Sequence, residues 1–145
     1  MLDDTDRRII DILTRDARVS LKELAQAAGL SSPSTSERLR RLEERGIIRA
    51  FTVDLSHEAL GYTLQAIARI RPLPGKLHIV QQMIADLPQV LECDKVTGDD
   101  CYIARIAVRS IDELDKLLDR IADKAETNTS IVKSQPVKRR NPPLG

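Results

Sequence analysis

The chain has no tryptophan, and its only aromatic residues are two tyrosines and one phenylalanine among 145 residues. No apolar run approaches the roughly 18 residues that would indicate a membrane-spanning helix. The N-terminus is acidic, whereas a secretory leader begins with basic residues before an apolar stretch. We therefore expect a protein with no membrane partner and a cytoplasmic location.

Cysteine and histidine are also scarce, with two residues of each. Cys93 and Cys101 form no Cys-x-x-Cys pair, and His57 and His78 lie far from them in the sequence. A zinc site needs such ligands in a cluster, so we expect no metal. The two cysteines are not expected to lie opposite each other on adjacent strands, which disfavours a disulfide. Since no nucleophile with a base and no usable carboxylate pair is evident, we predict no enzyme, no catalytic residues and no cofactor.

Charge is distributed unevenly along the chain although its formal total is only +1. Counting Lys/Arg against Asp/Glu, residues 1–50 carry +1, residues 51–128 carry −4 and residues 129–145 carry +4. A basic patch for nucleic acid must therefore be local. Two regions qualify: the arginines of residues 38–49, and Lys133, Lys138, Arg139 and Arg140 near the C-terminus. The alternative is a solvated helix face and a solubilising tail.

The first fifty residues show three helical patterns in succession. Apolar residues recur at helical spacing between Asp3 and Ala17, with acids in the opening turn where the helix dipole favours them. Ser20 and Glu23 then form a capping box, and Gly29 is a C-terminal stop signal. In the next segment we expect Ser32 to cap a third helix, Pro33 to occupy its first position and Gly46 to end it. This order is the helix-turn-helix plan, in which the last helix enters the DNA major groove.

The third helix has a cationic side and an apolar side. At 100° per residue, Ser34, Arg38, Arg41 and Arg45 lie within about 60° of one another, while Thr35, Leu39 and Leu42 form a neighbouring stripe. Hydroxyls and free amides at the helix start suit phosphates or base edges, and arginine can bind guanine through two hydrogen bonds. The predicted DNA-binding residues are Ser32, Ser34, Thr35, Ser36, Arg38, Arg41 and Arg45. The alternative is that Glu37, Glu43 and Glu44 pair with the same arginines on a solvated face.

Residues 47–55, IIRAFTVDL, are rich in β-branched residues, so we predict a strand or wing that completes a winged helix-turn-helix. Beyond a connecting segment, the patterns predict a strand at 64–71, a helix from Leu77 and strands at 90–96 and 102–109. A second helix, capped by Ser110 and carrying Leu114, Leu118, Ile121 and Ala125, precedes a last strand at 129–137. We assign residues 1–61 to the DNA-binding domain with its linker and residues 62–145 to the second domain.

The order βαββαβ predicts a ferredoxin-like domain, an antiparallel sheet with two helices on one face, so the fold class is α+β. RNA-recognition domains share this order, but they stack bases on aromatics of the central strands. Residues 64–71, LQAIARIR, contain no aromatic, which disfavours RNA. One face of the sheet is left uncovered in a single chain, and both domains are small, so we expect a homo-oligomer.

Four ordered stretches span nearly the whole chain: LDDTDRRIIDIL, LSSPSTSERLRRLEERGII, LPQVLECDKVTGDDCYIARI and NTSIVKSQPVK. Together they resemble the Lrp/AsnC (leucine-responsive regulatory protein, feast/famine) family of transcription regulators. The resemblance implies a nucleoid-associated regulator of double-stranded DNA with a ferredoxin-like domain of the RAM type. It also implies dimers formed through that domain, higher oligomers such as octamers, and an amino-acid effector between dimers.

The effector site that the resemblance implies is a loop and a nearby turn. Its residues here are Gly98, Asp99, Asp100, Cys101, Tyr102, Asn128 and Ser130. The family commonly has Gly-Asp-x-Asp before an aromatic, whereas this chain has Cys101 in place of the second aspartate. The lost acid weakens a charge contact to a ligand ammonium, which Asp99, Asp100 or loop backbone groups would have to replace. The alternatives are a plain β-turn and an architectural DNA-binding protein that needs no effector.

Overall fold

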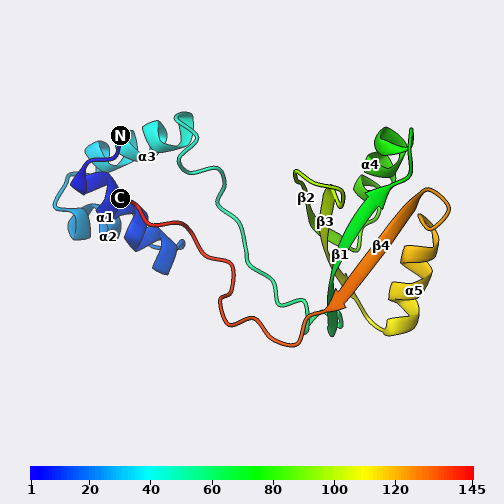
Figure 1. The fold of residues 1–145 in the computed structure, drawn as a ribbon. Coiled ribbons are helices and arrows are strands. Elements are labelled where there is room, and N and C mark those ends of the chain that lie inside the picture. Colours follow the sequence, from blue (N-terminus) through cyan, green and yellow to red (C-terminus); the bar gives the residue numbers. More distant parts are fainter. The chain divides into compact units, whose positions relative to one another are not determined.

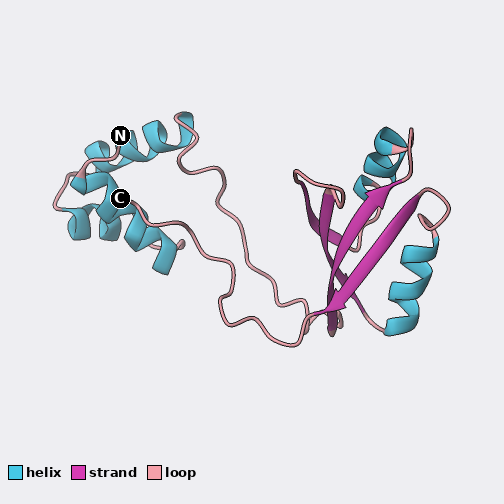
Figure 2. Cartoon of the chain, viewed as in Figure 1, coloured by secondary structure: helices cyan, strands magenta, loops and turns pink.

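The computed structural model describes residues 1–145 and divides the chain into two compact units. Unit 1 comprises residues 1–54 together with residues 139–145, and unit 2 comprises residues 55–138. Figure 1 follows the chain through both units, and Figure 2 shows that unit 1 contains helices and loops only. The sequence assigns the last seven residues to the second domain, whereas in the structure they pack with the helices of unit 1.

Unit 1 contains three helices whose ends follow local capping rules. They are α1 (Asp4–Arg15), α2 (Leu21–Ala28) and α3 (Ser32–Glu44). The Asp3 carboxylate accepts a hydrogen bond from the Asp6 amide at 2.7 Å and caps α1. Ser20 caps α2 in the same way, through the Glu23 amide at 3.1 Å. Gly29 ends α2 in the left-handed conformation, with φ of 70°, which glycine adopts without steric cost.

The start of α3 differs by one residue from the sequence prediction. Ser31, not Ser32, has the extended backbone of a cap, and its hydroxyl accepts a hydrogen bond from the Ser34 amide at 3.2 Å. Ser32 is therefore the first helical residue and Pro33 the second. Both positions tolerate proline because the amides of the first turn have no partner within the helix.

The core of unit 1 is small. Five apolar residues are buried in it, namely Ile9, Ile10, Leu24, Ala28 and Leu42. Thr35 is also fully buried, and its hydroxyl donates to the Ser31 carbonyl at 2.9 Å, which satisfies its polar group. Leu144, near the C-terminus, packs against the same cluster.

No strand forms in this chain at residues 47–55, where the sequence predicts a strand or wing. Residues 49–56 have no regular secondary structure, although Phe51, Val53 and Leu55 alternate as in a strand and are exposed. A strand forms only when its backbone finds a partner, and no segment of this chain pairs with these residues.

Unit 2 contains the predicted ferredoxin-like arrangement. Its elements are β1 (Leu64–Pro72), α4 (Leu77–Ala85), β2 (Val90–Lys95), β3 (Tyr102–Val108), α5 (Ile111–Asp119) and β4 (Ala125–Ile131). The four strands form one sheet in the order β2-β3-β1-β4, and all neighbours are antiparallel. The core lies between the sheet and both helices, because alternate residues of β1 and β3 are buried together with Val80 of α4 and Leu114 of α5 (Figure 1).

The last strand begins earlier than the sequence predicts, at Ala125 rather than Thr129, and Ala125 is not part of the second helix. The partner strand explains the shift. Ala125 pairs with Pro72 at one end and Ile131 with Ala66 at the other, so β4 matches the length of β1. Residues 134–137, predicted as strand, lie beyond the start of β1 and have no partner there.

Candidate DNA-binding and effector sites

Thr35 and Leu42 determine which side of α3 reaches solvent. Both are buried, at 0% and 1% exposure, and they anchor α3 to the other two helices. Thr35 is therefore inside the unit, and its side chain is not exposed for the DNA contact that the sequence predicts. Ser34 and Ser36 are exposed and Ser32 is partly exposed, as a contact with DNA requires.

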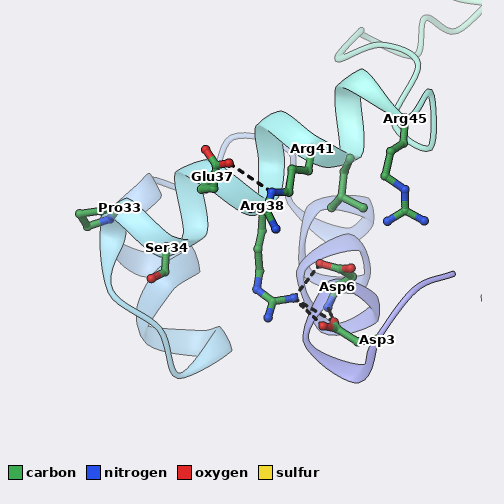
Figure 3. A pocket seen from close by; sticks show the side chains of 9 residues that line it. Asp3, Asp6, Pro33, Ser34, Glu37, Arg38, Arg41 and Arg45 are labelled. Carbon is green, nitrogen blue, oxygen red and sulfur yellow. Dashed lines mark hydrogen bonds and ion pairs between the residues drawn. The ribbon is translucent and has the colours of Figure 1, made fainter.

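The neighbouring side of α3 borders a hollow of about 500 Å³ (Figure 3). Its lining residues are Asp3, Asp6, Pro33, Ser34, Glu37, Arg38, Arg41, Leu42 and Arg45. The four residues predicted to share one face, Ser34 and the three arginines, are all among them. The structure thus brings together the face that the helical spacing predicts.

Arg38 is the least available cation of this face. Its guanidinium contacts Asp3 at 2.7 Å and Asp6 at 3.0 Å, and its side chain is only 31% exposed (Figure 3). Hydrogen bonding from Arg38, followed by the bond from the Asp6 amide, lowers the pKa of Asp3. The same bond to Asp3, with that to Asp6, raises the pKa of Arg38. Sequence reasoning missed this pairing because 35 and 32 residues separate the partners.

The glutamates of α3 also pair with its arginines, as the alternative interpretation anticipates. Arg40 contacts both Glu37 and Glu44, and Arg41 contacts Glu37 at 3.1 Å. Hydrogen bonding from Arg40 lowers the pKa of Glu37, and the two glutamates, Glu37 first, raise the pKa of Arg40. The Arg41 side chain nevertheless remains 66% exposed. Arg45 is exposed, and its guanidinium donates only to the Met1 carbonyl, at 3.3 Å. Exposed ion pairs are weak, so a phosphate can displace Glu37 from Arg41.

The predicted effector residues lie at three different places in unit 2. Gly98, Asp99, Asp100 and Cys101 form the loop between β2 and β3, where Gly98 has a φ of 110°. Asp100 is 3.4 Å from the Arg71 guanidinium. Arg71 also lies 3.8 Å from Glu126, so Asp100 belongs to a chain of charges at this end of the sheet. Cys101 packs against the core, which agrees with a thiol rather than a carboxylate at this position.

Tyr102 points toward the helices, whereas Asn128 and Ser130 do not. Tyr102 is 3% exposed, and its hydroxyl donates to the Gln81 side chain at 2.7 Å; burial raises its pKa. Asn128 pairs with Arg69 and Ser130 with Ile67, on the face of the sheet away from the helices. The structure therefore does not bring Tyr102 and these two residues together within one chain.

A hollow of about 280 Å³ adjoins Tyr102 and was not anticipated from the sequence. Gln81, Ile84, Ala85, Cys93, Lys95 and Tyr102 line it. Burial, with a smaller effect of Asp94, raises the pKa of the Cys93 thiol, so this thiol is not an activated nucleophile. Lys95 is exposed and is the only cation of the hollow. The period-2 alternation of β2 and β3 was the signal that could have placed Cys93, Lys95 and Tyr102 on one face.

No group of three or more Cys, His, Asp and Glu side chains is placed to hold a metal ion. Both cysteines are free. None of the helices has the length and apolar character needed to span a membrane.

Two family models match the chain. Residues 2–49 match the family model of a winged helix-turn-helix DNA-binding domain, and residues 65–142 match that of an Lrp/AsnC ligand binding domain. The HTH-type transcriptional regulator FL11 of Pyrococcus furiosus is 36% identical over 121 residues, which cover 83% of this chain and 80% of that protein.

Solved structures match over almost the full length. Bacillus subtilis LrpC superposes with a TM-score of 0.89 at 29% identity, covering 96% of this chain and 99% of that one. The transcriptional regulator NMB0573 of Neisseria meningitidis, solved as a complex with L-Met, superposes with a TM-score of 0.90 at 26% identity, covering 99% and 97%.

A helix-turn-helix unit joined to a ligand-binding ferredoxin-like unit defines a DNA-binding transcriptional regulator rather than an enzyme. The chain belongs to the Lrp/AsnC family of these regulators.

Proposed function

We propose that the protein binds specific DNA sequences as a homodimer, assembles into higher oligomers such as octamers, and responds to an amino-acid effector. The observation that carries the DNA-binding part is the serine and arginine side of α3, which borders the hollow while buried Thr35 and Leu42 on the neighbouring side hold the helix in place. Two such helices enter successive major grooves about 34 Å apart on an imperfect palindrome. The protein then acts at the nucleoid, in the cytoplasm.

Within this face, Arg41 and Arg45 are the main DNA contacts, because Arg38 is engaged by Asp3 and Asp6. Ser34 and Ser36 are exposed near the start of the helix, and Ser32 lies at its first position. Hydroxyls and amides at that end suit phosphate oxygens. Arg38 contributes to DNA binding only if a phosphate competes with its two acids.

Apolar side chains that are exposed in a single chain support the proposed oligomer. Phe51, Val53 and Leu55 are 51%, 75% and 57% exposed and alternate without a strand partner. On the uncovered face of the sheet, Ile67 and Ile103 are only partly buried. Exposed apolar patches of this kind indicate an interaction surface, here for a second copy of the chain.

The effector proposal rests on the loop at residues 98–101 and the hollow beside Tyr102. NMB0573, the Neisseria protein, was solved with L-Met, an amino acid. The hollow of about 280 Å³ has an apolar floor of Ile84 and Ala85, suited to an aliphatic side chain, and Lys95 suits a carboxylate. Asn128 and Ser130, on the other sheet face, join the same ligand only if a neighbouring copy supplies them. Ligand bound between dimers changes the oligomer by its differential affinity for the assemblies.

DNA binding by α3 is tested with Arg41→Ala in the full-length protein. We expect weaker binding to a genomic target duplex and, if Arg41 contacts phosphate, a slope of log affinity against log salt smaller by about one unit. Arg120→Ala removes an exposed arginine from the end of α5 and is the matched control. Equal affinities and slopes for both variants and the native protein would exclude Arg41 as a contact.

The effector is tested by calorimetric titration with the twenty amino acids. At least one should bind, and Asp100→Asn should weaken that binding, while Asp119→Asn on the exposed side of α5 should not. An architectural DNA-binding protein without an effector remains the second candidate, because Asp100 is engaged by Arg71 and the family's second loop acid is replaced by Cys101. No heat from any amino acid, together with a low ratio of specific to non-specific DNA affinity, would favour that candidate.

A further inference from the structure

The C-terminal end of the chain is part of the DNA-binding unit. Residues 139–145 group with the helices of unit 1, although they follow the last strand of unit 2 in the sequence. Two contacts hold them there. Leu144 packs against the apolar cluster of unit 1, and the Arg7 side chain of α1 donates to the Leu144 carbonyl at 3.2 Å.

Two arginines lie just before this anchor. Arg139 and Arg140 are exposed, and neither forms an ion pair. No acidic residue occurs anywhere in residues 129–145. Their charge is therefore not neutralised by the protein itself.

The recognition helix differs in this respect. Helix α3 carries three arginines and three glutamates, so its net charge is zero, and each of its arginines contacts a carboxylate. Affinity for DNA comes largely from cations that neutralise phosphates and release counterions. A helix that is neutral overall suits base reading better than phosphate neutralisation, so unit 1 needs another source of positive charge.

The spacing between the arginines and the anchor limits how far they can move. Pro142 and Pro143 lie between Arg140 and Leu144, and consecutive prolines favour an extended polyproline conformation of about 3.1 Å per residue. Arg140 thus stays within about 12 Å of the anchor. The anchor lies on α1 at Arg7, next to Asp6, which contacts Arg38 of α3. The two cations remain near the recognition helix because of this short, stiff connection.

We propose that residues 139–144 form an anchored basic arm whose Arg139 and Arg140 bind the DNA phosphate backbone beside the recognition helix. The ligand is double-stranded DNA through its sugar-phosphate surface, with no base reading by the arm. The arm rests on the proposed DNA-binding function and adds a second contact to it. Leu144 is a positioning residue, since it holds the arginines near the duplex without touching it.

The first test measures duplex binding by full-length protein over a range of salt concentrations. Replacing both arginines, Arg139→Ala with Arg140→Ala, should weaken binding to target and unrelated duplexes alike. It should also reduce the slope of log affinity against log salt by about two units. The ratio of native to variant affinity should therefore be about tenfold larger at 50 mM than at 200 mM salt. Lys133→Ala, which removes an exposed cation of the same segment from unit 2, should leave the slope unchanged.

The second test asks whether Leu144 acts through the arginines. Leu144→Asn should weaken DNA binding in the native background but cause no further loss when Arg139 and Arg140 are already alanine. A purely structural role would instead weaken binding by the same factor in both backgrounds, and that result would overturn the anchored arm. Urea unfolding of each variant shows whether Leu144→Asn has unfolded unit 1, and the exposed arginines should leave the unfolding midpoint unchanged.

The outcomes separate the arm from the proposed function. If the native protein binds duplex and the double arginine variant binds with the same affinity and slope, the arm is overturned and the function stands. An equal slope change for Lys133→Ala and Arg139→Ala would also overturn it, because the effect would then be one of general charge. If the native protein binds no duplex at any salt concentration, the proposed function fails and the arm with it.

Discussion

The two units of this chain are stabilised in different ways. Unit 2 buries a cluster of fourteen apolar residues between its sheet and helices, whereas the apolar cluster of unit 1 contains five. Polar contacts supplement the small core of unit 1. They are the Asp3 cap, the ion pairs of Arg38 with Asp3 and Asp6, and the hydrogen bond of the buried Thr35 hydroxyl. Several of these polar contacts lie on α3 itself, so in unit 1 residues that stabilise the fold lie on the helix that we propose contacts DNA.

In unit 2, the core and the candidate binding residues are largely separate. Asp99 and Asp100 lie in an external loop, and Asn128 and Ser130 lie on the uncovered face of the sheet. Tyr102 is the exception, since it is part of the core and also lines the hollow. Substitutions at most effector positions should therefore leave the fold intact, while substitutions along α3 need a stability control.

The largest difference in stability between the two units should come from matched truncations in their cores. Leu42→Ala in unit 1 and Ile106→Ala in unit 2 each remove a side chain that is 1% exposed, and each should cost about 2–5 kcal/mol. The loss is a much larger fraction of the stability of unit 1, so only Leu42→Ala should unfold its unit. Amide hydrogen exchange of both units reports this, and duplex binding should disappear with Leu42→Ala. Retained protection of α1 to α3 in that variant would contradict the contrast between the two units.

A smaller effect is expected at Thr35. Thr35→Val keeps the shape of the side chain but removes the hydrogen bond to the Ser31 carbonyl, at a cost of about 1 kcal/mol. Because Thr35 is fully buried, the affinity for DNA should not change once the protein is folded. Ser36→Ala, at an exposed position of the same helix, is the control that should leave unfolding nearly unchanged. A selective loss of DNA affinity in Thr35→Val, with unaltered urea unfolding, would restore Thr35 as a contact.

The smallest effect is expected at Asp3, and it depends on pH. Asn caps helices about as well as Asp, so Asp3→Asn keeps the cap of α1 and removes only the charge beside Arg38. Hydrogen bonding from Arg38 lowers the pKa of Asp3 from its usual 3.8. The stability that this carboxylate contributes is therefore present above its usual pKa and is lost as pH falls through the lowered value.

Urea unfolding at pH 7 and at acid pH values well below the usual carboxyl pKa of about 4 measures the contribution of Asp3. The native protein should be slightly more stable than Asp3→Asn at pH 7, and the difference should vanish in acid. Asp11→Asn, at an exposed aspartate of α1 without an ion pair, should show no such convergence. A gap between native and Asp3→Asn protein that persists in acid would show that the substitution acts through something other than the ion pair.

The features that the sequence determined by itself are the local ones. Asp3, Ser20 and Ser110 cap the starts of their helices by accepting hydrogen bonds from amides three residues on. Gly29 ends α2 through its own backbone conformation. Strand alternation and helical spacing likewise predict the order βαββαβ. The cationic side of α3 follows from helical geometry, because positions 34, 38, 41 and 45 share one side of any straight helix.

Other features were decided only by the tertiary structure. The partners of Arg38 lie 32 and 35 residues away, and Leu144 meets Arg7 across 137 residues. Residues 47–55 form no strand because a strand needs a neighbour, and β4 begins at Ala125 because β1 determines its length. Tyr102 and Asn128 lie on opposite faces because each strand's register determines where its side chains point. Pairing between distant segments depends on how the whole chain packs, and no local pattern of residues encodes it.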